Sequence, residues 1–140
     1  MYQLHPCSEE DKKSIIDGLV AYNLTCVPAV QEELFIDLSR KVVSEAGTVI
    51  GGIVARMYCW NCADVDALWV SEKYRGTGLG KKLLLQVEAA AREKGARFIH
   101  LDTFDFQARG FYENQGYEVF GVLDNCPEGH KRYYMKKCLL

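Results

Sequence analysis

A glycine-rich turn between a strand and a helix limits what this 140-residue chain can fold into. Residues 74–82 read YRGTGLGKK, in which three glycines stand beside one arginine and two lysines. The run before this turn, ADVDALWV, is typical of a strand, and the residues from Gly78 to Lys94 carry apolar side chains at helical spacing. The sequence therefore predicts a strand that passes through a tight loop directly into a long helix. Glycines in such a loop let the backbone come close to a ligand.

Two widespread phosphate-binding loops do not fit this spacing. In a P-loop the first glycine would fall on Arg75 and the hydroxyl residue on Lys82. The dinucleotide fingerprint needs two residues before its last glycine, whereas only Leu79 separates Gly78 from Gly80. The pattern that remains is Arg-x-x-Gly-x-Gly at the start of a helix.

The start of a helix can bind an anion without any special side chain. Its first N–H groups have no partners inside the helix, and their dipoles sum to a partial positive charge. Glycines remove the Cβ atoms that would cover these groups, so that a diphosphate can lie on them. Lys81 and Lys82 add positive potential. We therefore expect residues 75–80 to hold a diphosphate, and a glycine-containing turn without a ligand is the alternative.

The remaining pattern predicts one α+β domain over residues 1–140. Ser8 is a plausible N-cap with Asp11 near the capping-box position, and apolar residues follow at helical spacing. The segment around Pro28 is ambiguous. The expected order is strand 1–6, helix 8–23, two strands in 34–60 around a turn at 45–47, strand 63–70, helix 78–94, strand 96–104, helix 105–115 and strands 116–123 and 131–140.

Composition argues against several classes of protein. The formal net charge of −2 lacks the basic excess of a nucleic-acid-binding domain. No apolar run approaches the length of a membrane span. The first residues lack the layout of a signal peptide, so we expect a cytoplasmic location and reduced thiols.

The C-x-x-C pair Cys59 and Cys62 requires separate consideration. A structural zinc site needs four ligands, and no other cysteine or histidine pair has matching spacing. A redox motif should open a helix, whereas CWNC lies between two strand-like runs. We interpret it as a hairpin turn and expect no metal. A zinc or redox module is the alternative.

The chain resembles the GCN5-related N-acetyltransferase (GNAT) superfamily in two places. Residues 75–80 match its Q/R-x-x-G-x-G/A signature, and LWVSEKYRG matches its usual lead-in. The run ARGFYENQGYEVFG resembles a second signature, A-x-x-F/L-Y-x-x-x-G-F/Y, with matching residues Ala108, Phe111, Tyr112, Gly116 and Tyr117. The resemblance implies a GNAT fold with a mixed, mostly antiparallel sheet of about seven strands and about four flanking helices, splayed between strands 4 and 5.

This resemblance implies transfer of an acetyl group from acetyl-CoA, without a metal, to a primary amine by direct attack in a ternary complex. A small-molecule amine is the expected acceptor, and a protein or peptide amine or a non-catalytic acetyl-CoA-binding module are the alternatives. We expect neither nucleic acid nor membrane as partner. A homodimer is possible through the final strand, RYYMKKCLL.

The resemblance also implies which residues contact acetyl-CoA. The pyrophosphate is expected on the loop and the pantetheine arm on the strand before it. Asp105 stands where many family members have an asparagine, so it is expected to cap a helix instead and to leave that contact to a neighbour. The expected binding residues are Leu68, Trp69, Val70, Arg75, Gly76, Thr77, Gly78, Leu79, Gly80, Lys81 and Gln107.

Tyr112 matches the tyrosine that family members use to protonate the departing thiolate. The base is less certain, because both Asp64 and Asp66 interrupt an apolar strand. Asp66 is our choice, and Asp64 or a water-mediated route are alternatives, as are two histidines, His100 and His130. The N–H of Val70 is expected to stabilise the oxyanion. Aromatic side chains that line the acceptor pocket, or belong to the core, are Tyr22, Phe35, Trp60 and Phe106.

Overall fold

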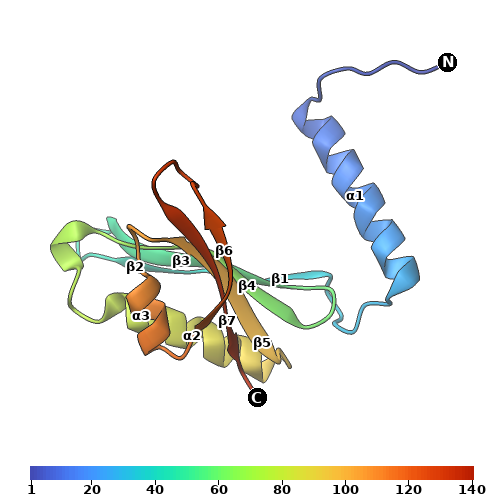
Figure 1. The fold of residues 1–140 in the computed structure, drawn as a ribbon. Coiled ribbons are helices and arrows are strands. Elements are labelled where there is room, and N and C mark those ends of the chain that lie inside the picture. The colour runs from blue at the N-terminus through green and yellow to red at the C-terminus, as the bar shows by residue number, and fades with distance from the viewer.

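Seven strands form one sheet in the computed structural model, which describes residues 1–140 (Figure 1). Three α-helices and one short 3₁₀ helix, η1, connect these strands. The elements are α1 (Glu9–Cys26), β1 (Phe35–Asp37), β2 (Arg40–Val43), β3 (Val49–Tyr58), β4 (Cys62–Val70), η1 (Glu72–Tyr74), α2 (Leu79–Glu93), β5 (Phe98–Phe104), α3 (Arg109–Asn114), β6 (Glu118–Asp124) and β7 (Lys131–Cys138). The expected α+β class and the mixed sheet are confirmed. None of the helices has the length and apolarity that crossing a bilayer requires.

The sheet has the strand order β1-β3-β4-β5-β7-β6, and β2 pairs with β3 beside β1. All neighbours are antiparallel except β4 and β5, which run parallel because α2 crosses between them. These two strands pair only through Ala63 with Ile99 and Asp64 with His100. Beyond these pairs they diverge, which confirms the expected separation between strands 4 and 5.

Helix α2 packs on one face of the sheet and closes the core. Its buried side chains recur at helical spacing and meet inward-pointing side chains of β3, β4 and β5. Burial of each large apolar side chain stabilises the fold by about 1.5–3 kcal/mol. The main contributors are Leu83, Leu84, Val87 and Ala91 on the helix and Ile53, Met57, Ala63, Ile99 and Leu101 on the sheet. This packing fixes the direction in which the first turn of α2 points.

The segment 34–60 contains three strands where two were expected. The Asp37 carboxylate accepts a hydrogen bond from the backbone N–H of Ser39 at 2.9 Å, which turns the chain and divides β1 from β2. The Ser39 hydroxyl then meets the backbone of Ala55 on β3. The turn expected at residues 45–47 is present, with Gly47 at φ +83°.

Helix α1 forms as expected but stands away from the sheet (Figure 1). The capping box of Ser8 and Asp11 is present, with Asp11 N–H to Ser8 Oγ at 3.1 Å and Ser8 N–H to Asp11 Oδ2 at 2.8 Å. However, no residue of α1 is buried. The strand expected at residues 1–6 is wrong, because this segment pairs with no other strand.

Two further expectations about the C-terminal part need correction. The final strand β7 lies between β5 and β6, so its backbone groups are paired on both sides and it offers no free edge for a dimer. Helix α3 covers only Arg109–Asn114, and its N-cap is Ala108 rather than Asp105. The Asp105 carboxylate instead accepts hydrogen bonds from the loop before β7.

A buried carboxylate connects α2 to β7 and to the end of the second signature. Glu88 is only 1% exposed, and its oxygens accept hydrogen bonds from Lys137 Nζ at 2.7 Å and Tyr117 Oη at 2.9 Å. The Tyr117 ring packs edge-on against Tyr112, with 5.6 Å between the centroids. The hydrogen bonds of Glu88 fix Tyr117, and the Tyr117 ring in turn restricts the position of Tyr112.

Replacing Lys137 tests this network. Lys137→Met leaves the Glu88 carboxylate buried without a cation, so the free energy of unfolding should fall by about 3 kcal/mol in urea titrations. Lys136→Met, at the exposed neighbouring position, is the matched control and should change it by no more than about 0.5 kcal/mol. Equal stability of the two variants would contradict a structural role for the ion pair.

Candidate functional site

A cleft of about 1040 Å³ opens where β4 and β5 separate. Its walls are the end of β4, the loop into α2, the end of β5 and the start of α3. Of the residues expected at the site, every one except Thr77 lines this cleft. These are Asp66, Leu68, Trp69, Val70, Arg75, Gly76, Gly78, Leu79, Gly80, Lys81, Gln107 and Tyr112.

The loop before α2 presents a row of free backbone donors. None of the N–H groups of residues 76–81 donates a hydrogen bond within the chain, and the first that does is Lys82, to the carbonyl of Gly78 at 3.1 Å. Gly76 and Gly78 have φ of +76° and +85°, which a side chain would strain. No side chain caps the helix. The unpaired donors and the helix dipole together make this turn a strong anion site.

Two side chains of the loop form hydrogen bonds that hold the loop in place. Arg75 Nε donates to the carbonyl of Val70 at 2.9 Å, which fixes the loop to the strand end. The hydroxyl of Thr77 donates to the carbonyl of Tyr74 at 2.6 Å, which explains why this residue does not line the cleft. Lys81 lines the cleft and contributes its charge.

The end of β4 also leaves backbone groups unpaired toward the cleft. The N–H of Ser71 donates to the carbonyl of Ile50 on β3 at 2.8 Å. Since peptide directions alternate along a strand, the N–H and C=O groups of Leu68 and Val70 point the other way, into the cleft. The Val70 carbonyl is occupied by Arg75, and its N–H is free.

Asp66 occupies a special position on β4. Ala55 pairs with Val65 and Val54 with Ala67, so Asp66 is the extra residue of a β-bulge. A bulge redirects a side chain without ending the strand. Asp66 accordingly lines both the large cleft and a second cavity of about 490 Å³ on the other side of β4.

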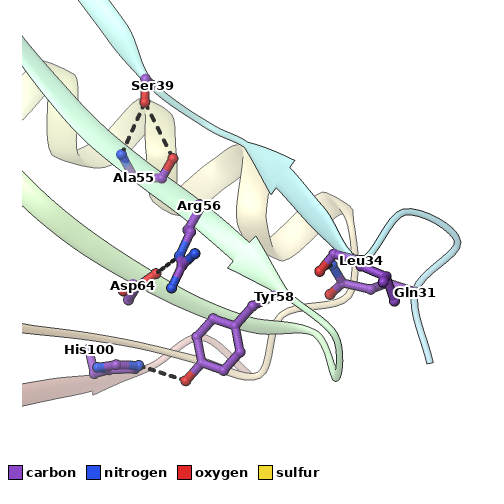
Figure 2. Close-up of polar contacts among 8 residues, drawn as sticks. All are labelled: Gln31, Leu34, Ser39, Ala55, Arg56, Tyr58, Asp64 and His100. Atoms are coloured by element: carbon purple, nitrogen blue, oxygen red, sulfur yellow. Dashed lines mark hydrogen bonds and ion pairs between the residues drawn. The ribbon is translucent and has the colours of Figure 1, made fainter. Parts of the chain in front are cut away.

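The second cavity lies between β1, β3 and β4. Figure 2 shows the contact between Arg56 and Asp64, two of the residues that line it. Arg56 is its central charge, with Nε 3.4 Å from Asp64 Oδ1 and its guanidinium 5.2 Å from the Phe35 ring centroid. Asp64 is therefore paired, whereas Asp66 has no ion-pair partner. Nearby, His100 Nε2 is hydrogen-bonded to Tyr58 Oη at 2.9 Å and does not line either cavity.

Tyr112 lies at the inner end of the cleft. Its side chain is buried between Phe111 and Tyr117, and its hydroxyl forms no hydrogen bond within the chain. Every fully buried side-chain nitrogen or oxygen atom in the structure has a hydrogen-bond partner. Because the Tyr112 hydroxyl has none, it is not fully buried, and it is accessible from the cleft that Tyr112 lines. Burial, with a smaller contribution from Asp102, raises the pKa of Tyr112 to about 12. The phenol is thus a protonated donor across the physiological range.

Gln107 and its neighbours shape the wall on the α3 side. Gln107 Oε1 accepts a hydrogen bond from the N–H of Phe104 at 2.8 Å, which leaves its amide NH₂ able to donate into the cleft. Asp105 Oδ1 bonds His130 Nδ1 at 2.9 Å, and the partners of the Asp105 carboxylate hold its pKa below the ordinary value despite desolvation. His130 stacks on Phe106, whose ring lines the cleft. Neither Asp105 nor His130 lines it.

Sequence reasoning missed an ion pair in the cleft wall. Asp102 on β5 and Arg132 on β7 lie 2.8 Å apart, and both line the cleft. In the sequence, Asp102 is only one of several polar residues that alternate with apolar residues along the predicted strand. Its partner comes from a strand 30 residues away, so only the register of β5 against β7 brings them together.

The CWNC segment forms the turn between β3 and β4, as expected. Cys59 and Asn61 have positive φ, and the Cys59 side chain is buried. No group of three His, Cys, Asp or Glu side chains is arranged to hold a metal ion.

The sequence profile described as the Acetyltransferase (GNAT) family matches residues 12–117. The blasticidin-S acetyltransferase of Streptomyces morookaense is 38% identical over 94 residues, which are 66% of this chain and 68% of that protein. An acetyltransferase of Agrobacterium fabrum is 32% identical over 131 residues, which are 91% of this chain and 90% of its own.

Solved structures show the same fold. A crystal structure of an acetyltransferase from Bacillus cereus superposes with a TM-score of 0.87 at 32% identity, over 98% of this chain and 97% of that one. A Bacillus anthracis protein described as a streptothricin acetyltransferase, in complex with acetyl coenzyme A, superposes with a TM-score of 0.63 at 25% identity, over 74% of this chain and 62% of that one.

The buried position of Tyr112 predicts an unusual titration. The difference in ultraviolet absorbance between the wild type and Tyr112→Phe should titrate near pH 12 rather than pH 10. Because the folded-state pKa is raised, the contribution of this phenol to stability is complete below about pH 10 and is lost as pH rises toward 12. A difference spectrum that titrates at pH 10 in folded protein would mean that the ring is solvated.

Proposed function

The chain belongs to the acetyltransferase (GNAT) family, and from that premise we propose that it transfers the acetyl group of acetyl-CoA to a primary amine of a small molecule. The amine attacks the thioester directly while both substrates are bound. The observation that carries this proposal is the uninterrupted row of unpaired N–H groups at residues 76–81, at the mouth of the cleft between β4 and β5.

Each part of acetyl-CoA has a complementary wall in the cleft. The loop amides and Lys81 suit the pyrophosphate, since they supply fixed donors and positive charge. The free backbone groups at the end of β4 suit the amides of the pantetheine arm, which can pair with them as an added strand does. The NH₂ of Gln107 provides a donor from the opposite wall.

The chemical step then needs a base, an oxyanion donor and an acid. Asp66 takes a proton from the ammonium group, directly or through water, and the neutral nitrogen attacks the carbonyl carbon. The Val70 N–H stabilises the oxyanion. As the C–S bond breaks, Tyr112 protonates the departing sulfur, the second proton of the nitrogen returns to the Tyr112 oxygen, and Asp66 gives its proton to solvent. The products are an amide and free coenzyme A, with one proton released.

The second cavity is the proposed acceptor pocket, because Asp66 joins it to the cleft. Its size of about 490 Å³ suits a small molecule. The names of the relatives favour the same class, since blasticidin-S and streptothricin are small-molecule acceptors of those proteins by name. A small primary amine is therefore favoured over a lysine side chain or a protein N-terminus.

A screen for thiol release tests the proposal. Purified protein with acetyl-CoA should release coenzyme A when a small amine from a panel of antibiotics, polyamines and amino acids is added, and not with peptides of matched charge. Release with peptides alone would assign a protein acetyltransferase. Calorimetric binding of acetyl-CoA without release by any amine would indicate a non-catalytic binding module, and no binding heat would refute the proposal.

Removing the Tyr112 hydroxyl should affect the chemical step alone. Tyr112→Phe keeps the buried ring, so acetyl-CoA affinity by calorimetry should stay within about twofold while kcat falls about 100-fold or more. Phe111→Leu, which changes the packing beside the same ring, is the control and should retain most of kcat. An unchanged kcat in Tyr112→Phe would remove this residue as the acid.

Replacing Asp66 and Asp64 one at a time tests which of the two β4 carboxylates is the general base. Asp66→Asn should lower kcat/KM at neutral pH about 100-fold, with partial recovery at higher pH where more of the amine is already neutral. Asp64→Asn removes the partner of Arg56 and should mainly raise KM. The reverse assignment follows if Asp64→Asn shows the pH-dependent loss.

A further inference from the structure

The face of the sheet opposite α2 has no cover. Along β3, Ile53, Ala55 and Met57 are buried under α2, whereas the alternate residues Val54 and Arg56 are exposed. Exposed apolar side chains continue over this open face, among them Phe35, Trp69, Phe98 and Phe120. A sheet with one apolar face in water is not a stable end state for a domain.

The open face is hollowed where β1, β2, β3 and β4 meet. The 490 Å³ cavity adjoins another of about 510 Å³, and the two share Ser39 and Val54. The second of them is lined by Trp69, Val49 and Gly52 along the same strands. Together they form a groove that follows the strands, and Asp66 lies at its edge.

Helix α1 carries the complementary surface. Ile15, Leu19 and Tyr22 are spaced by four and three residues, which aligns them on one face, and Cys26 extends this stripe. These three side chains are 60%, 55% and 65% exposed. The helix has 18 residues and is therefore about 27 Å long, which matches the length of β3 at about 33 Å.

The connection between α1 and β1 directs the helix away from its own sheet. The N–H of Val30 donates to the Cys59 carbonyl at 2.9 Å, and Trp60 Nε1 donates to the Val27 carbonyl at 2.8 Å. Gln31 Oε1 accepts a hydrogen bond from the N–H of Asn61. Gln31 Nε2 donates to the carbonyl of Leu34, the residue beside it in Figure 2. These bonds fix the base of α1 to the β3–β4 turn, and Figure 1 shows the helix pointing off that end of the sheet.

The position of α1 recurs in a solved relative. Residues 1–26 are nearly a fifth of the chain, and the Bacillus cereus structure matches over 98% of the chain with a TM-score of 0.87. Such a score requires that the corresponding helix also stands away from its sheet. The extended arrangement is therefore common to at least two proteins of this type.

We propose that two copies of this chain exchange their α1 helices, so that the Ile15–Leu19–Tyr22 stripe of each packs over the groove on the open face of the other and occupies its part of about 510 Å³. A membrane surface is disfavoured as occupant, because α1 begins with Glu9, Glu10 and Asp11 and has no basic residue in its last turn. A second copy needs no further component, since each chain offers both the stripe and the groove.

Exchange also completes the acceptor pocket. The cavity beside Asp66 is the other part of the groove, and the α1 helix of the second copy covers it as an outer wall without filling it. This consequence rests on the proposed acetyl transfer, whereas the exchange itself does not. It places specificity for the acceptor partly on a helix that belongs to the other chain.

Light scattering over a dilution series tests the exchange. The wild type should have twice the monomer mass of 15.9 kDa, and Leu19→Glu should be monomeric at the same concentrations, because it places a charge in the stripe. Ala21→Glu adds the same charge to α1 away from the stripe and should stay dimeric. A monomeric wild type, or a Leu19→Glu dimer, would overturn the proposal.

Mixing two defective variants tests exchange in trans. Leu19→Glu keeps an intact cleft and groove, and Tyr112→Phe keeps an intact α1. In a mixture, α1 of the Tyr112→Phe chain covers the groove of the Leu19→Glu chain, so activity should exceed the sum of the separate activities at least threefold. Simple additivity, with a dimeric wild type, would show that α1 does not complete the site in trans. A wild type that releases no thiol with any amine would refute the acetyl transfer and leave the mass measurement valid.

Discussion

The separation of β4 from β5 is the constraint on which the site depends. Only Ala63–Ile99 and Asp64–His100 are paired, and beyond them two parallel strands leave backbone groups without partners. Unpaired groups inside a sheet are unfavourable unless something else bonds them. The bulge at Asp66 and the loop before α2 both lie at the opening, and the loop adds further free donors. The unpaired strand edges and the free loop donors are the groups that the extended amide arm and the pyrophosphate of the proposed donor, acetyl-CoA, would bind.

The local chemistry of the loop made this part of the site predictable from sequence. Gly76 and Gly78 need φ values that other residues avoid, and the following run is an unambiguous helix, so the anion site follows from neighbouring residues alone. The second signature likewise placed Tyr112 correctly in the cleft. The pair Asp102–Arg132 was missed, because its formation depends on the register between distant strands. The separation of α1 from its own sheet could not be predicted for a related reason: the apolar spacing of a helix indicates that one face tends to be buried, but not which surface covers it.

The structure gives Tyr112 two tasks through one ring. Its body packs against Tyr117, which the buried Glu88–Lys137 pair holds in place, and its hydroxyl alone reaches the cleft. Burial raises its pKa to about 12, so the phenol keeps its proton at neutral pH, as the proposed role of acid for the departing thiolate requires. The buried network and the proposed acid are therefore in direct contact through the Tyr117 ring. A substitution at Lys137, which does not line the cleft, should therefore affect the position of the Tyr112 ring through Glu88 and Tyr117.

The exchanged helix divides the two substrates between chains. The cleft proposed for acetyl-CoA is lined only by residues of one chain, from β4, β5, β7, α2, α3 and the loops between them, so its affinity should be independent of association. The acceptor cavity lies on the open face, where the second chain provides a wall. At protein concentrations below the dissociation constant of the dimer, the chains separate and the acceptor cavity loses the α1 helix of the second copy. KM for the amine should then rise, whereas the affinity for acetyl-CoA should not change. No residue of α1 belongs to the core of its own chain. The surface of α1 that faces the acceptor could therefore change in sequence without affecting the fold or the affinity for acetyl-CoA.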